Sequence, residues 1–260
     1  TGENQTITLK AIDALTGNAV GEPQTVYTQV DDRRLFLIDI PDEQTNPFMI
    51  QVAGDVEAFD NSLFVAPENI REVTLPYLGA GSAEDPKTAL FYIQRAVSGL
   101  EDPIVTFQKA EGDWSQNTDT LLIILDTPDI NQTNAAKRYL ANGGPALLLL
   151  KERAQLKLID FLSGESGWQS PALSRDYGLL GTIDFEHPVF RIFANPRYNN
   201  FTNIRFWEPQ AIKPPVGSSA RVLAQFDEGP ASIVEVPLDS GNLIIWGGDW
   251  TPKASQWVLS

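Results

Sequence analysis

The alternation of apolar and polar residues near the start of the chain is typical of short β-strands. In the segment Thr6–Ile12, Ile7 and Leu9 alternate with polar residues, as in a strand with one buried face. Segments that we also predict to be strands follow at Thr25–Val30, Arg34–Ile40, Pro47–Val52 and Ser62–Val65. Because polar turns separate these segments, we predict a small antiparallel, immunoglobulin-like β-sandwich over residues 1–70.

The pattern changes after Pro67. A strand over Val73–Gly79 is followed by a segment with the apolar spacing of a helix and by a strand over Ile104–Phe107. The helical positions are Ala89, Ile93, Ala96, Val97 and Leu100, after a Pro86 that suits a first helical turn. The runs Leu121–Leu125 and Ala146–Leu150 are apolar on both faces, as central parallel strands are.

A helix is expected between these two runs. Asn131 or Thr133 can cap its start, and Asn142-Gly143-Gly144 ends it. Later elements are expected at Ala154–Leu162 (helix), Arg221–Phe226 with Ser232–Val236 (hairpin), Asn242–Trp246 (strand) and Pro252–Leu259 (short helix). Alternating strands and helices predict a three-layer α/β domain over residues 71–260.

The composition excludes several classes of function. A net charge of −15 repels the phosphates of nucleic acids and anionic lipid headgroups. No stretch approaches the roughly 20 apolar residues of a membrane span. We therefore expect no nucleic acid partner and no insertion into a membrane by this segment. The chain starts at Thr1 and its single methionine is Met49, so we expect a piece of a longer protein.

The first candidate binding site follows the run Leu121–Leu125. Asp126 and Asp129 lie just beyond this predicted strand, and ligands of open α/β sheets bind outside the carboxyl ends of strands. These carboxylates could orient a substrate or hold a cation. Alternatively, Asp126 and Thr127 tie down a loop and cap the next helix.

The second candidate is the single histidine, His187. With Asp184 or Glu186 beside it, His187 could act as a general base oriented by a carboxylate. No serine elbow and no cysteine is available as its nucleophile. The alternative is a histidine that is hydrogen-bonded to the backbone of a structured loop.

Two further patterns leave alternatives open. Asp55, Asp60 and Asn61 could hold calcium, but their spacing does not match an EF-hand and turns explain them equally. The tryptophans could form a sugar-stacking platform or anchor the core and interfaces. They are Trp114, Trp168, Trp207, Trp246, Trp250 and Trp257. We expect no cofactor and no metal site.

Part of the chain resembles the class I glutamine amidotransferase-like fold, which is a three-layer, flavodoxin-like fold. The resemblance lies in the segments Asp119–Asp126, Asn142-Gly143-Gly144 and Ala146–Leu150. True amidotransferases carry a nucleophilic cysteine on an elbow with glycines on both sides. Here Lys151-Glu152-Arg153-Ala154 follows the strand, so the resemblance implies a degenerate site without catalytic residues.

Three other segments resemble bacterial membrane proteins of the BatA type, which have an aerotolerance-regulator N-terminus and a von Willebrand factor A domain. They are Gly54-Asp55 with Asp60-Asn61, Ile183–Phe193, and Gly247–Ser260. In that family a β-sandwich precedes the amidotransferase-like domain and a transmembrane helix follows it. The resemblance implies the extracytoplasmic, periplasmic part of a membrane-anchored protein.

The sequence thus leaves two functions open. The first is a non-catalytic interaction or structural module that binds a protein partner, such as another domain of the parent protein. The second is a hydrolase or carbohydrate-handling domain that uses Asp126, Asp184 and His187 at the carboxyl edge of the sheet. The absence of a cysteine nucleophile and of a serine elbow favours the non-catalytic function.

Overall fold

The structure, a computed structural model, divides into two compact units, Thr1–Ile70 and Arg71–Ser260. The boundary lies close to the change of pattern after Pro67. The structure describes residues 5–29, 35–41, 44–54, 60–66, 71–112, 114–195, 197, 201 and 203–259.

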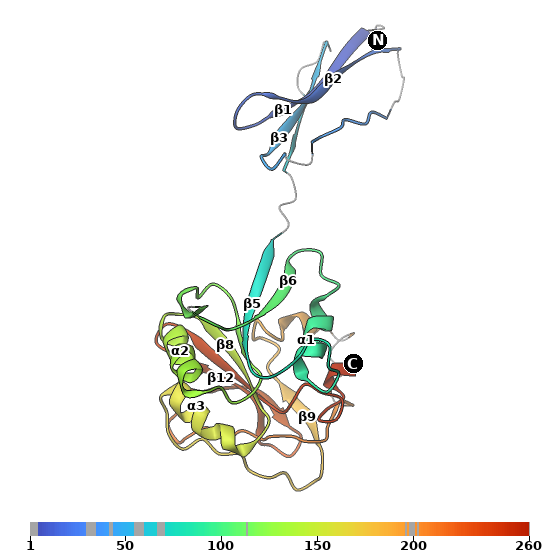
Figure 1. Cartoon of the computed structure of the whole chain (residues 1–260). Coiled ribbons are helices and arrows are strands. Elements are labelled where there is room, and N and C mark those ends of the chain that lie inside the picture. Colours follow the sequence, from blue (N-terminus) through green and yellow to red (C-terminus); the bar gives the residue numbers. More distant parts are fainter. Residues whose placement is uncertain are drawn as a thin grey trace. The chain divides into compact units, whose positions relative to one another are not determined.

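The first unit is a four-stranded antiparallel sheet with the order β2-β1-β3-β4 (Figure 1). Its strands are β1 (Gln5–Asp13), β2 (Ala19–Thr28), β3 (Phe48–Ala53) and β4 (Ser62–Val65). Its buried apolar cluster consists of Ala11, Val20 and Phe48. The strands expected at Thr6–Ile12, Pro47–Val52 and Ser62–Val65 are confirmed.

The expected β-sandwich differs from this unit. Its described residues form a single sheet, so a second layer of strands is not seen among them. Within the segment Arg34–Ile40, residues 35–40 form no strand, and Arg34 lies outside the described residues. Leu35 and Leu37 are largely exposed, so the apolar character of the segment wrongly indicated a strand.

The second unit is a mixed α/β domain with a nine-stranded sheet, in the order β10-β9-β11-β12-β13-β8-β7-β5-β6. Five strands are parallel: β5 (Glu72–Leu78), β6 (Ile104–Lys109), β7 (Leu122–Ile124), β8 (Pro145–Leu150) and β13 (Asn242–Gly247). The antiparallel part has β9 (Gly178–Ile183), β10 (Arg205–Phe206), β11 (Arg221–Phe226) and β12 (Ala231–Pro237).

Helices cover both faces of this sheet (Figure 1). The helix α1 (Ala89–Val97) packs on one face, and α2 (Ile130–Ala141) and α3 (Leu156–Ser163) pack on the other. Short 3₁₀ segments are η1 (Trp114–Gln116), η2 (Arg153–Gln155), η3 (Arg191–Ala194) and η4 (Trp257–Leu259). Strands that are covered on both sides need apolar residues at every position, which explains the unbroken apolar run of β8.

The side chains of alternate β8 residues pack into two separate hydrophobic cores. Leu148 and Leu150 belong to the cluster under α2 and α3, whereas Leu147 and Leu149 belong to the cluster under α1. This division follows from the period of two along a strand. The expected central strands Leu121–Leu125 and Ala146–Leu150 are therefore confirmed.

Several local expectations are corrected. Asp129, not Asn131 or Thr133, caps α2, because its carboxylate accepts hydrogen bonds from the backbone of Asn131 and Gln132. Pro86 lies before α1, which begins at Ala89 after Thr88. The expected helix at Pro252–Leu259 is reduced to η4. The strand β9, which lies in an aromatic and loop-rich stretch, was not expected.

Candidate functional site

Three charged side chains meet beyond the carboxyl ends of the parallel strands. Asp126 follows β7, Lys151 follows β8 directly, and Asp249 follows β13. The Lys151 Nζ atom lies 2.8 Å from Asp126 Oδ1 and 3.4 Å from Asp249 Oδ1. All three side chains are partly buried, so the ion pairs are less screened than surface pairs are. We call these three residues the edge cluster.

The edge cluster lies next to the position in the sheet where the strand order reverses. From β5, the next parallel strand β6 lies on one side and β7 lies on the other, and such switch points are where open α/β sheets bind ligands. Here the second carboxylate oxygen of Asp126 accepts a hydrogen bond from the Ala80 backbone N–H at 3.1 Å. The backbone N–H group that follows β5 therefore donates to a carboxylate of the chain itself.

Gly79 makes this close approach possible. Its φ of +141° is a conformation that residues with side chains rarely adopt. A Cβ atom added there would also lie 2.8 Å from the Asp126 Oδ2 atom. The glycine at the end of β5 thus allows the Asp126 carboxylate to sit against the backbone.

A polar pocket of about 430 Å³ adjoins the edge cluster at Lys151. Its lining includes the cationic side chains of Arg153 and Arg175, the Trp207 ring and Gln210. Trp207 is 39% exposed, so its ring is available to a partner. A ligand bound here would meet several charged and polar groups and one aromatic ring.

Beside this pocket, aromatic rings and guanidinium groups stack on one another. The Arg205 guanidinium lies 5.6 Å from the Trp207 ring centroid and 5.8 Å from that of Tyr177. Arg175 approaches the same Tyr177 ring at 5.5 Å. These distances allow cation–π attraction. We call Arg175, Tyr177, Arg205 and Trp207 the arginine–aromatic cluster.

Acidic groups hold one of these arginines in place. Arg175 forms ion pairs with Glu228 at 2.9 Å and with Asp227. These hydrogen bonds raise the pKa of Arg175 above its usual range. Hydrogen bonds from Ser174, and then from Arg175, lower the pKa of Glu228 to about 2. Arg175 therefore stays charged and in a fixed orientation, whereas Arg205 forms no ion pair within the described part of the chain.

The four candidate residues from the sequence are not brought together. Asp126 belongs to the edge cluster, and Asp129 is the cap of α2. Asp184 forms an ion pair with Arg221, at the start of β11. Burial alone would raise the pKa of Asp184, but hydrogen bonds from Arg221 and from the Glu186 backbone lower it below its usual range.

His187 lies elsewhere than expected. Its Nε2 atom is 3.2 Å from Glu235 Oε2, and Glu235 also accepts a hydrogen bond from Asn242, the first residue of β13. This places the imidazole toward the amino ends of the parallel strands. The expectation that His187 lies at the carboxyl edge is therefore wrong. His187 is also buried, at 6% exposure, which suits the structural alternative.

The tryptophans do not share one surface. Trp168 and Trp246 are buried, and Trp246 packs against Trp250 and Trp257 at 5.1 Å and 4.8 Å between ring centroids. Trp207 and Trp114 line two different pockets. The expectation of core anchors holds for Trp168 and Trp246, and a single platform of all six is not formed.

No metal-binding group and no membrane-spanning helix is found within the described ranges. No three His, Cys, Asp or Glu side chains gather there in a way that could hold a metal ion. Of the expected calcium ligands, Asp55 lies outside these ranges. None of the helices described is both long and apolar enough to cross a membrane.

Sequence reasoning missed Lys151 and Asp249. Both follow strands that are almost entirely apolar, at the same sheet edge as Asp126. A charged residue directly after a buried parallel strand was the signal that could have identified them, because the carboxyl ends of such strands meet at one edge. The arginine–aromatic cluster gave no such signal, since β9 was not expected.

No protein-family model matches the chain, and no curated protein matches it. Among solved structures, the chain is similar to the exo-beta-1,4-mannosidase Op5Man5 from Opitutaceae bacterium strain TAV5. The similarity has a TM-score of 0.44 with 12% sequence identity, and it covers 70% of this chain. The chain corresponds to 32% of the length of that protein. A similarity of this size says nothing about the activity of this chain.

Proposed function

We propose that this chain is a non-catalytic interaction module that binds a protein partner through the arginine–aromatic cluster. The observation that carries the proposal is the stack of Tyr177, Arg205 and Trp207, of which Arg205 and Trp207 are exposed. Tryptophan, tyrosine and arginine are the residue types that dominate binding energy in protein interfaces. The contacts within the stack hold these side chains in place before binding, which lowers the entropic cost of association.

The edge cluster supports a non-catalytic role. Lys151 stands directly after β8, in the segment where an amidotransferase would carry its nucleophilic elbow, and it is paired with two carboxylates. The Asp126 carboxylate is also bound to the Ala80 amide. These contacts tie together the segments that follow β5, β7, β8 and β13, which is a structural role.

The flavodoxin-like, amidotransferase-like assignment is part of this proposal. The order β6-β5-β7-β8-β13 supports it, because it is the order 2-1-3-4-5 of flavodoxin-like sheets. Membership of the BatA-type family, a membrane-anchored parent and a periplasmic location rest on the sequence segments alone.

A second candidate function is carbohydrate handling. The hydrolase form of this idea needs Asp126, Asp184 and His187 to converge, and each has a different partner. A purely binding form takes support from a pocket of the second unit that is lined by Gln108, Trp114 and Asn117.

The interaction proposal is tested with the whole chain as bait. A partner captured from membrane extracts, purified and titrated by calorimetry should bind Trp207→Ala and Arg205→Ala more weakly, by about 2 kcal/mol or more for a central hot-spot residue. Arg138→Ala, which removes an exposed arginine of α2, is the matched control and should bind normally.

Two results would contradict the proposal. One is a partner that binds all variants equally. The other is turnover of an ester, amide or glycoside substrate that disappears in His187→Ala while the thermal unfolding of that variant is unchanged.

A further inference from the structure

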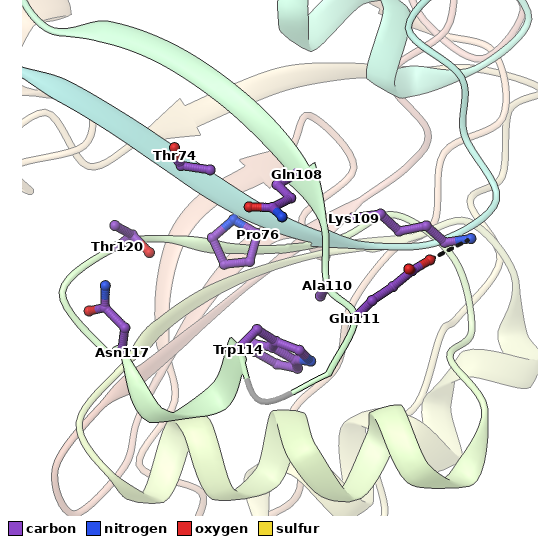
Figure 2. Close-up of a pocket in the computed structure, with 9 residues that line it drawn as sticks. All are labelled: Thr74, Pro76, Gln108, Lys109, Ala110, Glu111, Trp114, Asn117 and Thr120. Atoms are coloured by element: carbon purple, nitrogen blue, oxygen red, sulfur yellow. Dashed lines mark ion pairs between the residues drawn. The ribbon is translucent and has the colours of Figure 1, made fainter.

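We infer that a second pocket, between β5, β6 and the described residues 110–112 and 114–120, binds a neutral saccharide. Its volume is about 280 Å³, and Figure 2 shows side chains from both strands and from that segment around it. The crossover from β6 to β7 contains only the three-residue η1 in its described part. The α2-facing side of the outer strands is therefore left open by this connection. This inference is independent of the protein-binding proposal.

The two strands present a polar face to this pocket. Thr74 pairs with Thr106 and Pro76 with Gln108 across the β5–β6 ladder, and their side chains alternate with apolar ones. Leu75, Tyr77 and Phe107, on the opposite face, pack against the core under α1. The polar face thus belongs to strands that are otherwise well anchored, so the positions of its side chains are fixed by the sheet.

Trp114 forms an aromatic wall of the pocket. Its side chain lies across from Pro76 and Gln108 in Figure 2. The ring packs against Tyr139 of α2 with 5.5 Å between centroids, which restricts its rotation. The C–H faces of a pyranose ring are apolar, and they pack well against a fixed aromatic surface of this kind.

The polar groups of the pocket match hydroxyl groups. Carboxamides donate and accept hydrogen bonds, as sugar hydroxyls do. The Asn117 Oδ1 atom accepts from the Asp119 backbone N–H at 3.1 Å, which orients its NH₂ group as a donor. The Gln108 side chain forms no hydrogen bond within the described part of the chain, so both of its functional atoms are available.

The charge of the pocket points to a neutral ligand. Lys109 and Glu111 lie 3.9 Å apart and offset each other. The net charge of −15 further disfavours an anion. A ligand with many hydroxyls, one apolar face and no charge satisfies all of these features, and neutral oligosaccharides have this chemistry.

The test uses the full chain and five neutral disaccharides: maltose, cellobiose, mannobiose, xylobiose and chitobiose. Saturation-transfer NMR and calorimetry should detect at least one of them, with a Kd of about 1 mM or lower. The indole N–H signal that is absent from Trp114→Phe identifies Trp114 and should shift on binding. A galacturonate disaccharide should bind at least about tenfold more weakly than the neutral ligand.

Paired variants locate the site. Gln108→Ala removes an exposed side chain with no partner and should weaken saccharide binding by about tenfold, whereas Gln94→Ala on α1 should leave it unchanged. Trp114→Ala should abolish it. If Trp114→Ala destabilises the fold, Gln108→Ala still decides the question.

The saccharide inference is overturned if none of the neutral disaccharides binds, or if binding survives both Gln108→Ala and Trp114→Ala. Trp207→Ala separates the two proposals, because it should weaken the protein partner and leave the saccharide unaffected. If the protein-binding proposal fails, the saccharide inference is therefore still tested by its own measurements.

Discussion

The four-stranded unit and the nine-stranded unit differ in how many of their faces are covered. The first unit encloses the cluster Ala11, Val20 and Phe48 beside one sheet. The second unit has helices on both faces, and neighbouring residues of one strand, such as Leu148 and Leu149, enter different cores. Since stability grows with the apolar area removed from water, the second unit should unfold separately and at the higher temperature.

The largest effect is expected from Leu148→Ala in the second unit. Leu148 is a fully buried residue of β8 that packs in the core under α2 and α3, so the substitution leaves a cavity. We expect a loss of roughly 3 to 5 kcal/mol in the free energy of unfolding of this unit. Scanning calorimetry should show the upper transition lowered and the lower one unchanged. Leu100→Ala, at 49% exposure, should change neither transition.

Phe48→Ala gives the corresponding test in the first unit. Phe48 is the largest member of its small cluster, and its truncation should cost about 3 kcal/mol. The lower transition should disappear or move to a much lower temperature, while the upper one stays in place. Leu63→Ala on β4, which is 61% exposed, is the control. A joint shift of both transitions would refute independent unfolding.

The smallest effect is a pH dependence confined to the first unit. Hydrogen bonds from Asn46, from the backbone of Thr16 and from Gln44 hold the pKa of Asp13 far below its usual range. Because the folded-state pKa is lowered, this stabilisation is complete above the unfolded pKa of about 3.9 and is lost as the pH falls below it.

The measurement is the lower unfolding midpoint between about pH 5 and about pH 2. It should fall more steeply in the unaltered chain than in Asp13→Asn, whose side chain does not titrate. Equal slopes for the two proteins would show that Asp13 does not contribute to acid sensitivity.

The strands that could be predicted from the sequence are those with a simple environment. Leu121–Leu125 and Ala146–Leu150 are apolar throughout because both of their faces are buried. The strand β9 was missed because Gly178, Gly181 and Thr182 interrupt its apolar residues. Its buried and exposed positions do not alternate regularly, and aromatic loops surround it. Residues 35–40 show the opposite error, since they were expected to form a strand and do not, and Leu35 and Leu37 are exposed.

The sequence predicted where the candidate site lies, but it did not predict which residues form it. Asp126 was found because its position after β7 is visible in the sequence. The other two members of the edge cluster, Lys151 and Asp249, lie 25 and 123 residues later along the chain. His187 was placed wrongly because its neighbours in the sequence, Asp184 and Glu186, suggested a partnership, whereas the folded chain supplies Glu235 from β12.

The Asp126 carboxylate also determines how one partly buried charge is balanced. It joins the Ala80 amide to the Lys151 ammonium group, at the sheet edge where open α/β sheets bind their ligands. The positive charge of Lys151 therefore has its counter-ion within the polypeptide and needs none from solution.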